Sequence, residues 1–138
     1  MLIAHDIIRV QILHVWGEEG VCKSLPLLIE LLKYGRRHSE VVILEGLLDS
    51  EAYRPLFETA VEEYGCNIFA YDYDPFFEET PLRHRTKPNH LDFGEEDMRR
   101  WWREKDYLAY IPETVLAKDI SLENAAEKIY RHVTTGGV

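Results

Sequence analysis

The chain has 138 residues, of which 46% are hydrophobic and 30% are charged, a balance that excludes wholesale disorder and fits one ordinary domain. Its 16 lysines and arginines against 25 aspartates and glutamates give a net charge of −9, which argues against partners such as nucleic acid or an anionic membrane. The two cysteines, without CxxC spacing, are typical of a reduced, cytoplasmic protein. No apolar run approaches the ~20 residues that span a bilayer, and the first residues lack the features of a signal peptide.

Apolar spacing and chain breakers predict alternating strands and helices along the chain. Strands are predicted at residues 2–4, 41–44, 67–73 and 107–111. Helices are predicted at residues 7–15, 25–35, 51–64, 74–85, 94–105 and 121–132. The segment 7–15 also fits a second strand, and we favour the helix. Residues 17–20 are interpreted as a turn and residues 86–93 as a polar loop.

This alternation favours an α/β fold of three layers, in which helices flank a mostly parallel sheet. Ligands bind such sheets beyond the carboxyl ends of the strands. Three of the predicted strands end at or next to Asp6, Glu45-Gly46, and Asp72 or Asp74. We therefore expect acidic residues to gather where a ligand would lie.

Asp6 and Glu45 are the first candidates for chemistry. Asp6 has Arg9 three residues later, and its carboxylate can act as a general base or hold a substrate hydroxyl. The alternative role for Asp6 is the N-cap of the helix that starts at residue 7. Glu45 follows four apolar residues, an arrangement in which a carboxylate holds a metal-bound nucleotide or its water. The alternative is an acidic residue that orders the next loop.

A dense basic cluster stands out in this acidic chain. It comprises Arg83, His84, Arg85 and Lys87, with Arg99, Arg100 and Arg103 close behind. Two or three arginines around one loop can clamp phosphate oxygens. The alternative is a solvated helix face, paired with the acids Glu78, Glu79, Glu95 and Glu96.

Two other patterns argue against the sites that they suggest. The six histidines are scattered without HxxxH or HExxH spacing, so we predict no transition-metal site. Residues 17–24 superficially look like a phosphate-binding loop that ends in Lys-Ser. Cys22 stands where the last glycine of that loop must be, and a Cβ there blocks the backbone approach to phosphate. We therefore reject this segment as a nucleotide site.

Four runs of sequence carry a resemblance to a known family. They are Val42-Ile43-Leu44-Glu45-Gly46-Leu47-Leu48 followed by Tyr53, Tyr71-Asp72-Tyr73-Asp74, Phe77-Glu78-Glu79-Thr80-x-x-Arg83-His84-x-Thr86-Lys87-Pro88 and Phe93-Gly94-Glu95-x-x-Met98-Arg99-x-Trp101-Trp102. The match extends back through Tyr34-Gly35-x-x-His38 to Asp6-Ile7-Ile8-Arg9. In these runs the chain resembles bacterial P-loop kinase-like proteins of the zeta-toxin and chloramphenicol-phosphotransferase type.

The resemblance implies a single P-loop kinase-like domain over residues 1–138, with a lid at about residues 75–106. Members of this family begin with a strand, a phosphate-binding loop and a helix, about thirty residues that have no counterpart here. Their first strand is the central one of the sheet, between the strands that match residues 41–44 and 67–73. Either these two strands pair directly in the present chain, or another chain fills the gap.

The resemblance also implies roles for single residues. Asp6 would be the catalytic acid that faces the substrate, and Arg9, Glu45 and Gly46 would bind the substrate, Gly46 by allowing close backbone approach. The basic residues that would lie over the nucleotide phosphates are Arg83, Arg85, Lys87 and Arg99.

From these roles we expect an ATP- and Mg²⁺-dependent phosphotransferase that acts on a small molecule. We expect it to be inactive as an isolated chain, because the phosphate-binding loop is missing. The alternative expectation is a non-catalytic remnant that works as a dimeric binding or interaction module. A homodimer would cover the edges that an incomplete sheet leaves open.

Overall fold

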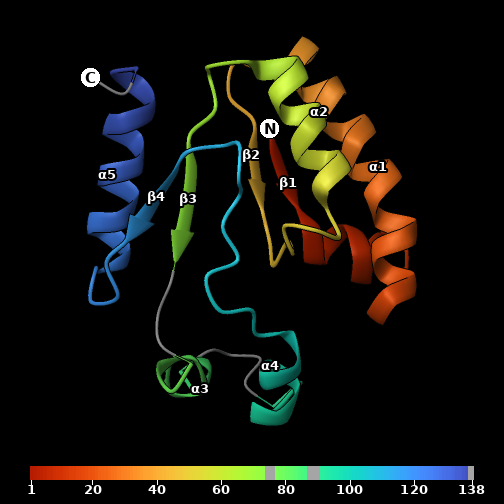
Figure 1. Ribbon diagram of the computed structural model, residues 1–138, viewed down its shortest axis with the longest axis vertical. Helices are drawn as coiled ribbons and strands as arrows, with labels where there is room; N and C mark the ends of the chain where they lie inside the picture. Colours follow the sequence, from red (N-terminus) through yellow and green to blue (C-terminus); the bar gives the residue numbers. More distant parts are fainter. Residues whose placement is uncertain (74–76, 87–90, 137–138) are drawn as a thin grey trace. The chain divides into compact units, whose positions relative to one another are not determined.

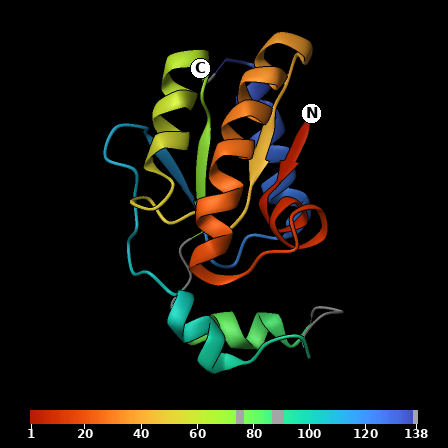
Figure 2. The same ribbon diagram turned by 90° about the vertical axis from the view of Figure 1, so that its right-hand side faces the viewer.

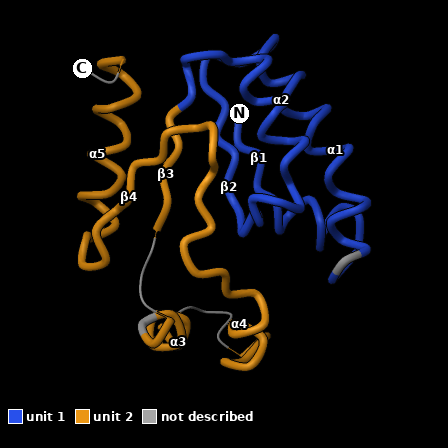
Figure 3. Tube along the Cα trace, in the orientation of Figure 1, with its two compact units in different colours: residues 1–68 blue, residues 69–138 orange. Residues whose placement is uncertain are grey.

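Two pairs of parallel strands, each with its own helices, form the framework of the chain (Figures 1 and 2). The structure is a computed structural model that describes residues 1–73, 77–86 and 91–136. The chain divides into two compact units, residues 1–68 and residues 69–138 (Figure 3). The fold is mixed α/β with parallel strands, as the sequence predicts at this coarse level.

The first unit is a two-stranded sheet with two helices on one face (Figure 2). β1 (Leu2–Ala4) pairs with β2 (Ile43–Glu45), and α1 (Gly17–His38) packs beside α2 (Arg54–Tyr64). The buried core of this unit comprises Ile3, Ile8, Leu28, Leu32, Tyr53 and Leu56. Ile3 therefore points from the sheet into the layer that the helices form.

The other face of this sheet carries exposed apolar side chains. Leu2 is 62% exposed and its register partner Ile43 is 55% exposed, whereas Ile3 is 1% exposed. Successive side chains of a strand point to opposite faces, so Leu2 and Ile43 share the face away from α1 and α2. The prediction of a fully buried strand at residues 41–44 is therefore wrong for one face of β2.

α1 begins at Gly17, where the sequence predicts a turn. Gly20 is buried in this helix. A Cβ at this position would lie only 2.8 Å from Cδ of Arg9, so a larger residue would not fit. Gly20 thereby allows α1 to pack closely against η1 (Ile7–Ile12). The sequence predicts an ordinary helix in this region, and the structure has a π-helical turn. Residues 17–24 are helical, in agreement with their rejection as a phosphate-binding loop.

The second unit is built on β3 (Ala70–Tyr73) and β4 (Glu113–Leu116), with α5 (Leu122–Thr134) beside them (Figure 1). The Tyr71 hydroxyl lies 2.7 Å from Nδ1 of His132, which ties β3 to α5. The predicted cap of α5 is confirmed, because Ser121 Oγ accepts a hydrogen bond from the Asn124 amide. The predicted strand at 107–111 is wrong, since the strand in this region begins at Glu113.

The segment between β3 and β4 contains two short helices, α3 (Glu79–His84) and α4 (Glu95–Trp101), which contact each other. The buried ring of His84 stacks on Phe93 at 4.1 Å between centroids, and its Nε2 lies 3.0 Å from the Phe93 carbonyl. The predicted helix start at residues 74–75 lies outside the described residues. The predicted helix at 94–105 ends four residues early, at Trp101.

The strands of the described residues pair only within their own units. β2 pairs with β1, and β3 pairs with β4. Direct pairing between the strands predicted at 41–44 and 67–73, one of the two outcomes that the sequence left open, is not found in this part of the chain. Of the helices in the described residues, none is long and apolar enough to cross a membrane.

Candidate functional site

The carboxyl ends of β1 and β2 bring together four of the predicted site residues. Ala4 pairs with Glu45 in the parallel register, so the residues that follow each strand leave the sheet at the same edge. Asp6 and Arg9 come from the chain that leaves β1, and Glu45 and Gly46 from the end of β2. Asp6 and Glu45 therefore follow neighbouring strand ends at this edge, and both are exposed.

Asp6 is held by Arg9. Its Oδ1 accepts a hydrogen bond from Nη2 of Arg9 at 3.0 Å, while 67% of the Asp6 side chain stays exposed. Asp6 precedes η1 but makes no side-chain capping bond to it, so the alternative role as an N-cap is not found. The carboxylate is therefore fixed by a neighbouring cation and open to solvent.

His5 and Tyr53 form a buried pair beneath Asp6. His5 is 3% exposed and Tyr53 is 2% exposed, with the Tyr53 hydroxyl 2.6 Å from Nε2 of His5 and the rings edge to face at 5.1 Å. Neither residue is among the sites predicted from the sequence. His5 directly follows an apolar strand, and Tyr53 stands among the residues that carry the family resemblance, but no spacing rule connects two residues 48 positions apart.

The electrostatics of this pair favour its neutral form. Burial lowers the pKa of His5 below its ordinary value of 6.5, an effect that Asp6 opposes and Arg9 reinforces. Burial raises the pKa of Tyr53, and the nearby Ser24 hydroxyl lowers it. The Ser24 side chain is itself fully buried. At neutral pH the pair is thus a histidine and a tyrosine that are both uncharged.

Gly46 has a different neighbour from the one that the sequence predicts. Its φ of +151° is a conformation that favours glycine, and a Cβ would lie 2.5 Å from the Cβ of His5. The family resemblance implies close backbone approach to a ligand at this glycine. In the structure, the side chain that lies against this glycine is His5.

The predicted phosphate-binding arginines lie in the second unit and have protein partners. The Arg83 guanidinium lies over the Tyr73 ring, 4.7 Å from its centroid, and donates to the Lys118 carbonyl. Arg99 lies 4.2 Å from the centroid of Phe77. It also pairs with Glu95 at 3.2 Å, which agrees with the alternative of a solvated, acid-paired helix face. Arg85 is exposed directly after α3, and Lys87 lies outside the described residues.

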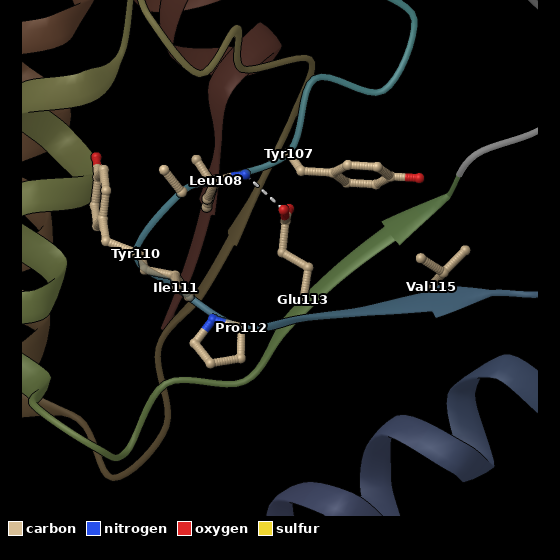
Figure 4. A pocket seen from close by; sticks show the side chains of 8 residues that line it. Tyr107, Leu108, Tyr110, Ile111, Pro112, Glu113 and Val115 are labelled. Carbon is tan, nitrogen blue, oxygen red and sulfur yellow. Dashed lines mark hydrogen bonds between the residues drawn. The ribbon is translucent and has the colours of Figure 1, made fainter.

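A hollow of about 590 Å³ lies in the second unit and is lined by none of the predicted site residues (Figure 4). Its walls come from residues 107–113 and Val115, and the Leu108 amide donates to Oε2 of Glu113 at 2.6 Å. Burial raises the pKa of Glu113, the Leu108 hydrogen bond lowers it, and the nearby carboxylates of Asp72 and Asp106 raise it again.

Within the described ranges, no group of three or more His, Cys, Asp or Glu side chains is arranged to hold a metal ion. Comparison with protein-family models, with curated proteins and with solved structures gives no match to this chain. The resemblance to P-loop kinase-like proteins therefore stays a prediction from the sequence.

Proposed function

We propose that this chain is a P-loop kinase-like phosphotransferase domain for a small molecule. It depends on a phosphate-binding loop that its own 138 residues do not contain. The observation that carries the proposal is the meeting of Asp6 and Glu45 at the carboxyl edge of β1 and β2, the edge where parallel sheets bind ligands. Within residues 1–68, β2 pairs with β1 alone, which supports the need for a further strand beside this sheet.

In this proposal Asp6 accepts the proton of the acceptor hydroxyl. Its carboxylate is exposed, and Arg9 holds it in one place. ATP is the phosphoryl donor, and Mg²⁺ arrives with it as the nucleotide complex, because Mg²⁺ is usually bound by one or two carboxylates plus substrate phosphates. Glu45, exposed at the end of β2, would be the carboxylate that helps to hold this complex.

The basic residues after β3 neutralise the phosphates in the proposed reaction. Arg83 and Arg99 must then exchange their present partners, the Lys118 carbonyl and the Glu95 carboxylate, for phosphate oxygens. Arg85 and Lys87 are the other two cations of this group. For Arg99 the exchange costs little, because an exposed ion pair contributes only ~0–1 kcal/mol.

The dependence on a further loop follows from the backbone. A phosphate-binding loop offers several backbone N–H groups that point at one anion. Residues 17–24 form the start of α1 instead, and from Gly20 onward, whose amide donates to the Trp16 carbonyl at 3.1 Å, the backbone follows the hydrogen-bonding pattern of the helix. We expect the isolated chain to bind ATP too weakly for catalysis.

The proposal is tested by supplying the missing part. A designed strand–loop–helix segment that carries G-x-x-x-x-G-K-[ST] is fused ahead of Leu2, and binding of Mg²⁺·ATP is measured by calorimetry. We expect the fusion to bind ATP and the matched fusion with Ala in place of the loop lysine to lose most of that binding. Asp6→Asn should keep the affinity for ATP and lose phosphoryl transfer to hydroxyl acceptors. A fusion that is folded by circular dichroism but binds no ATP contradicts the proposal.

A second candidate function is a homodimeric interaction module. The exposed pair Leu2 and Ile43 favours it, because parallel sheets are normally covered on both faces. We expect sedimentation velocity to detect a dimer at micromolar concentrations and Ile43→Lys to produce a monomer. The matched control is Val61→Lys, on an exposed position of α2. A wild-type monomer at every concentration contradicts this second function.

A further inference from the structure

The strongest unassigned feature is a buried contact that joins three segments of the first unit. His5 lies at the end of β1, Gly46 at the end of β2, and Tyr53 directly before α2. The histidine ring is held on one side by the Tyr53 hydroxyl at 2.6 Å and on another by the Gly46 backbone, which leaves no room for a Cβ. The ring therefore has little freedom to rotate.

We propose that His5 is a positioning residue, which locks the carboxyl end of β1 and thereby fixes where the Asp6 carboxylate points. The role of Asp6 in catalysis rests on the proposed function, whereas the lock itself rests on the contacts of the first unit. His5 touches no substrate in this proposal and acts through its neighbour in the chain.

The contacts also assign the protons of the pair. Nδ1 of His5 faces the Asp6 carboxylate, 3.8 Å from Oδ1, and is buried without a hydrogen-bond partner. A proton on Nδ1 is attracted by that carboxylate, whereas a lone pair there would be repelled. Neutral His5 therefore carries its proton on Nδ1, and Nε2 accepts the hydrogen bond that the Tyr53 hydroxyl donates.

The protonation state of His5 decides whether Arg9 is the only neighbouring cation of this pair that attracts the Asp6 carboxylate or competes with the histidine ring for it. While His5 is neutral, Arg9 is the cation that pairs with Asp6, at 3.0 Å. A protonated His5 becomes a second cation beside the same carboxylate and loses the acceptor for the Tyr53 hydroxyl. The titratable and charged groups that face the pair are Asp6 and Arg9 from the β1–η1 segment and Asp49 from the loop before α2. Asp6 favours the protonated ring and Arg9 opposes it.

The test is an NMR experiment on the isotope-labelled chain without nucleotide. Long-range ¹H–¹⁵N spectra give the tautomer of each histidine, and the His5 signals are identified by their loss in His5→Gln. We expect protonated Nδ1 and unprotonated Nε2 for His5 near neutral pH. Tyr53→Phe keeps the ring and removes the hydroxyl, so we expect it to raise the pH at which His5 titrates.

The chemical shift of the Asp6 carboxyl carbon distinguishes a positioning role of His5 from a merely structural one. We expect this chemical shift to show an inflection at the titration of His5, in addition to that of Asp6 itself, and to lose that inflection in His5→Gln. Protonated Nε2 at neutral pH, or an Asp6 signal that ignores the titration of His5, overturns the proposal. If ATP binding fails in the fused protein while the shared inflection persists, the proposed function falls and the lock stands.

Discussion

At the scale of single residues, His5 should make the stability of the first unit depend on pH. Its pKa in the folded chain is lowered from the ordinary value of 6.5, chiefly by burial, so below that value the unfolded chain binds more protons than the folded chain. The His5 contribution is therefore complete above about pH 6.5 and is lost as the pH falls through the lowered pKa. Urea unfolding of the wild type and His5→Gln at several pH values measures it. Parallel pH profiles for the two proteins would contradict the assignment.

Gly46 is the second residue with a sharp expectation. Gly46→Ala places a Cβ 2.5 Å from the Cβ of His5, and a buried ring cannot give way cheaply. We expect a loss of ~2–4 kcal/mol in the free energy of unfolding, from backbone strain and overpacking together. The matched control is Gly65→Ala, which also has a positive φ, +58°, but meets nothing within 4 Å. Gly65→Ala should lose only about 1 kcal/mol, and equal losses in the two variants would contradict the contact.

At the scale of elements, Arg83 serves as a brace in this structure. It joins α3 to the Lys118 carbonyl and covers the Tyr73 ring. We expect Arg83→Ala to lower the free energy of unfolding of the second unit by ~1–2 kcal/mol, from one charged hydrogen bond and one exposed cation–π contact. Arg85→Ala, two residues later and exposed, is the matched control and should stay within about 0.5 kcal/mol of the wild type. Identical urea midpoints for the two variants would exclude the brace.

The elements that the sequence predicts well are those with local signals. Residues 2–4 form β1 as predicted, and the Ser121 cap and the Gly65 stop mark their helices because each is decided by neighbouring backbone groups. The start of α1 was missed because Gly20 is a packing residue whose reason, the Arg9 side chain, lies in another element. The prediction of a strand at 107–111 was wrong. The apolar side chains of this segment, among them Tyr107, Leu108 and Tyr110, line a hollow, and its backbone does not pair with another strand of the described residues.

The candidate site divides in the same way. Asp6 and Glu45 were found because carboxylates after apolar strands meet at one edge of any parallel pair. His5 and Tyr53 were missed because their contact joins residues far apart in the sequence. For Gly46 the sequence predicts a ligand as its neighbour, and the structure places the His5 side chain against it. Patterns report which residues share an edge or a face, and only tertiary packing reports which of them touch.

At the scale of the whole molecule, each of the two units contains a sheet of only two parallel strands. Two-stranded sheets are marginal on their own, and the exposed Leu2 and Ile43 add to the incompleteness of the first unit. A homodimer would cover this apolar face. Because only the folded chain would associate, the midpoint of thermal unfolding should then rise as the concentration of the chain rises.

The measurement that tests the central claim most directly is calorimetric titration of the unmodified 138-residue chain with Mg²⁺·ATP. We expect no binding up to about millimolar ATP, because residues 17–24 form a helix and not a loop whose backbone amides converge on one anion. Micromolar binding that disappears in Arg83→Ala would contradict the claim, since it would place a complete nucleotide site within the chain itself.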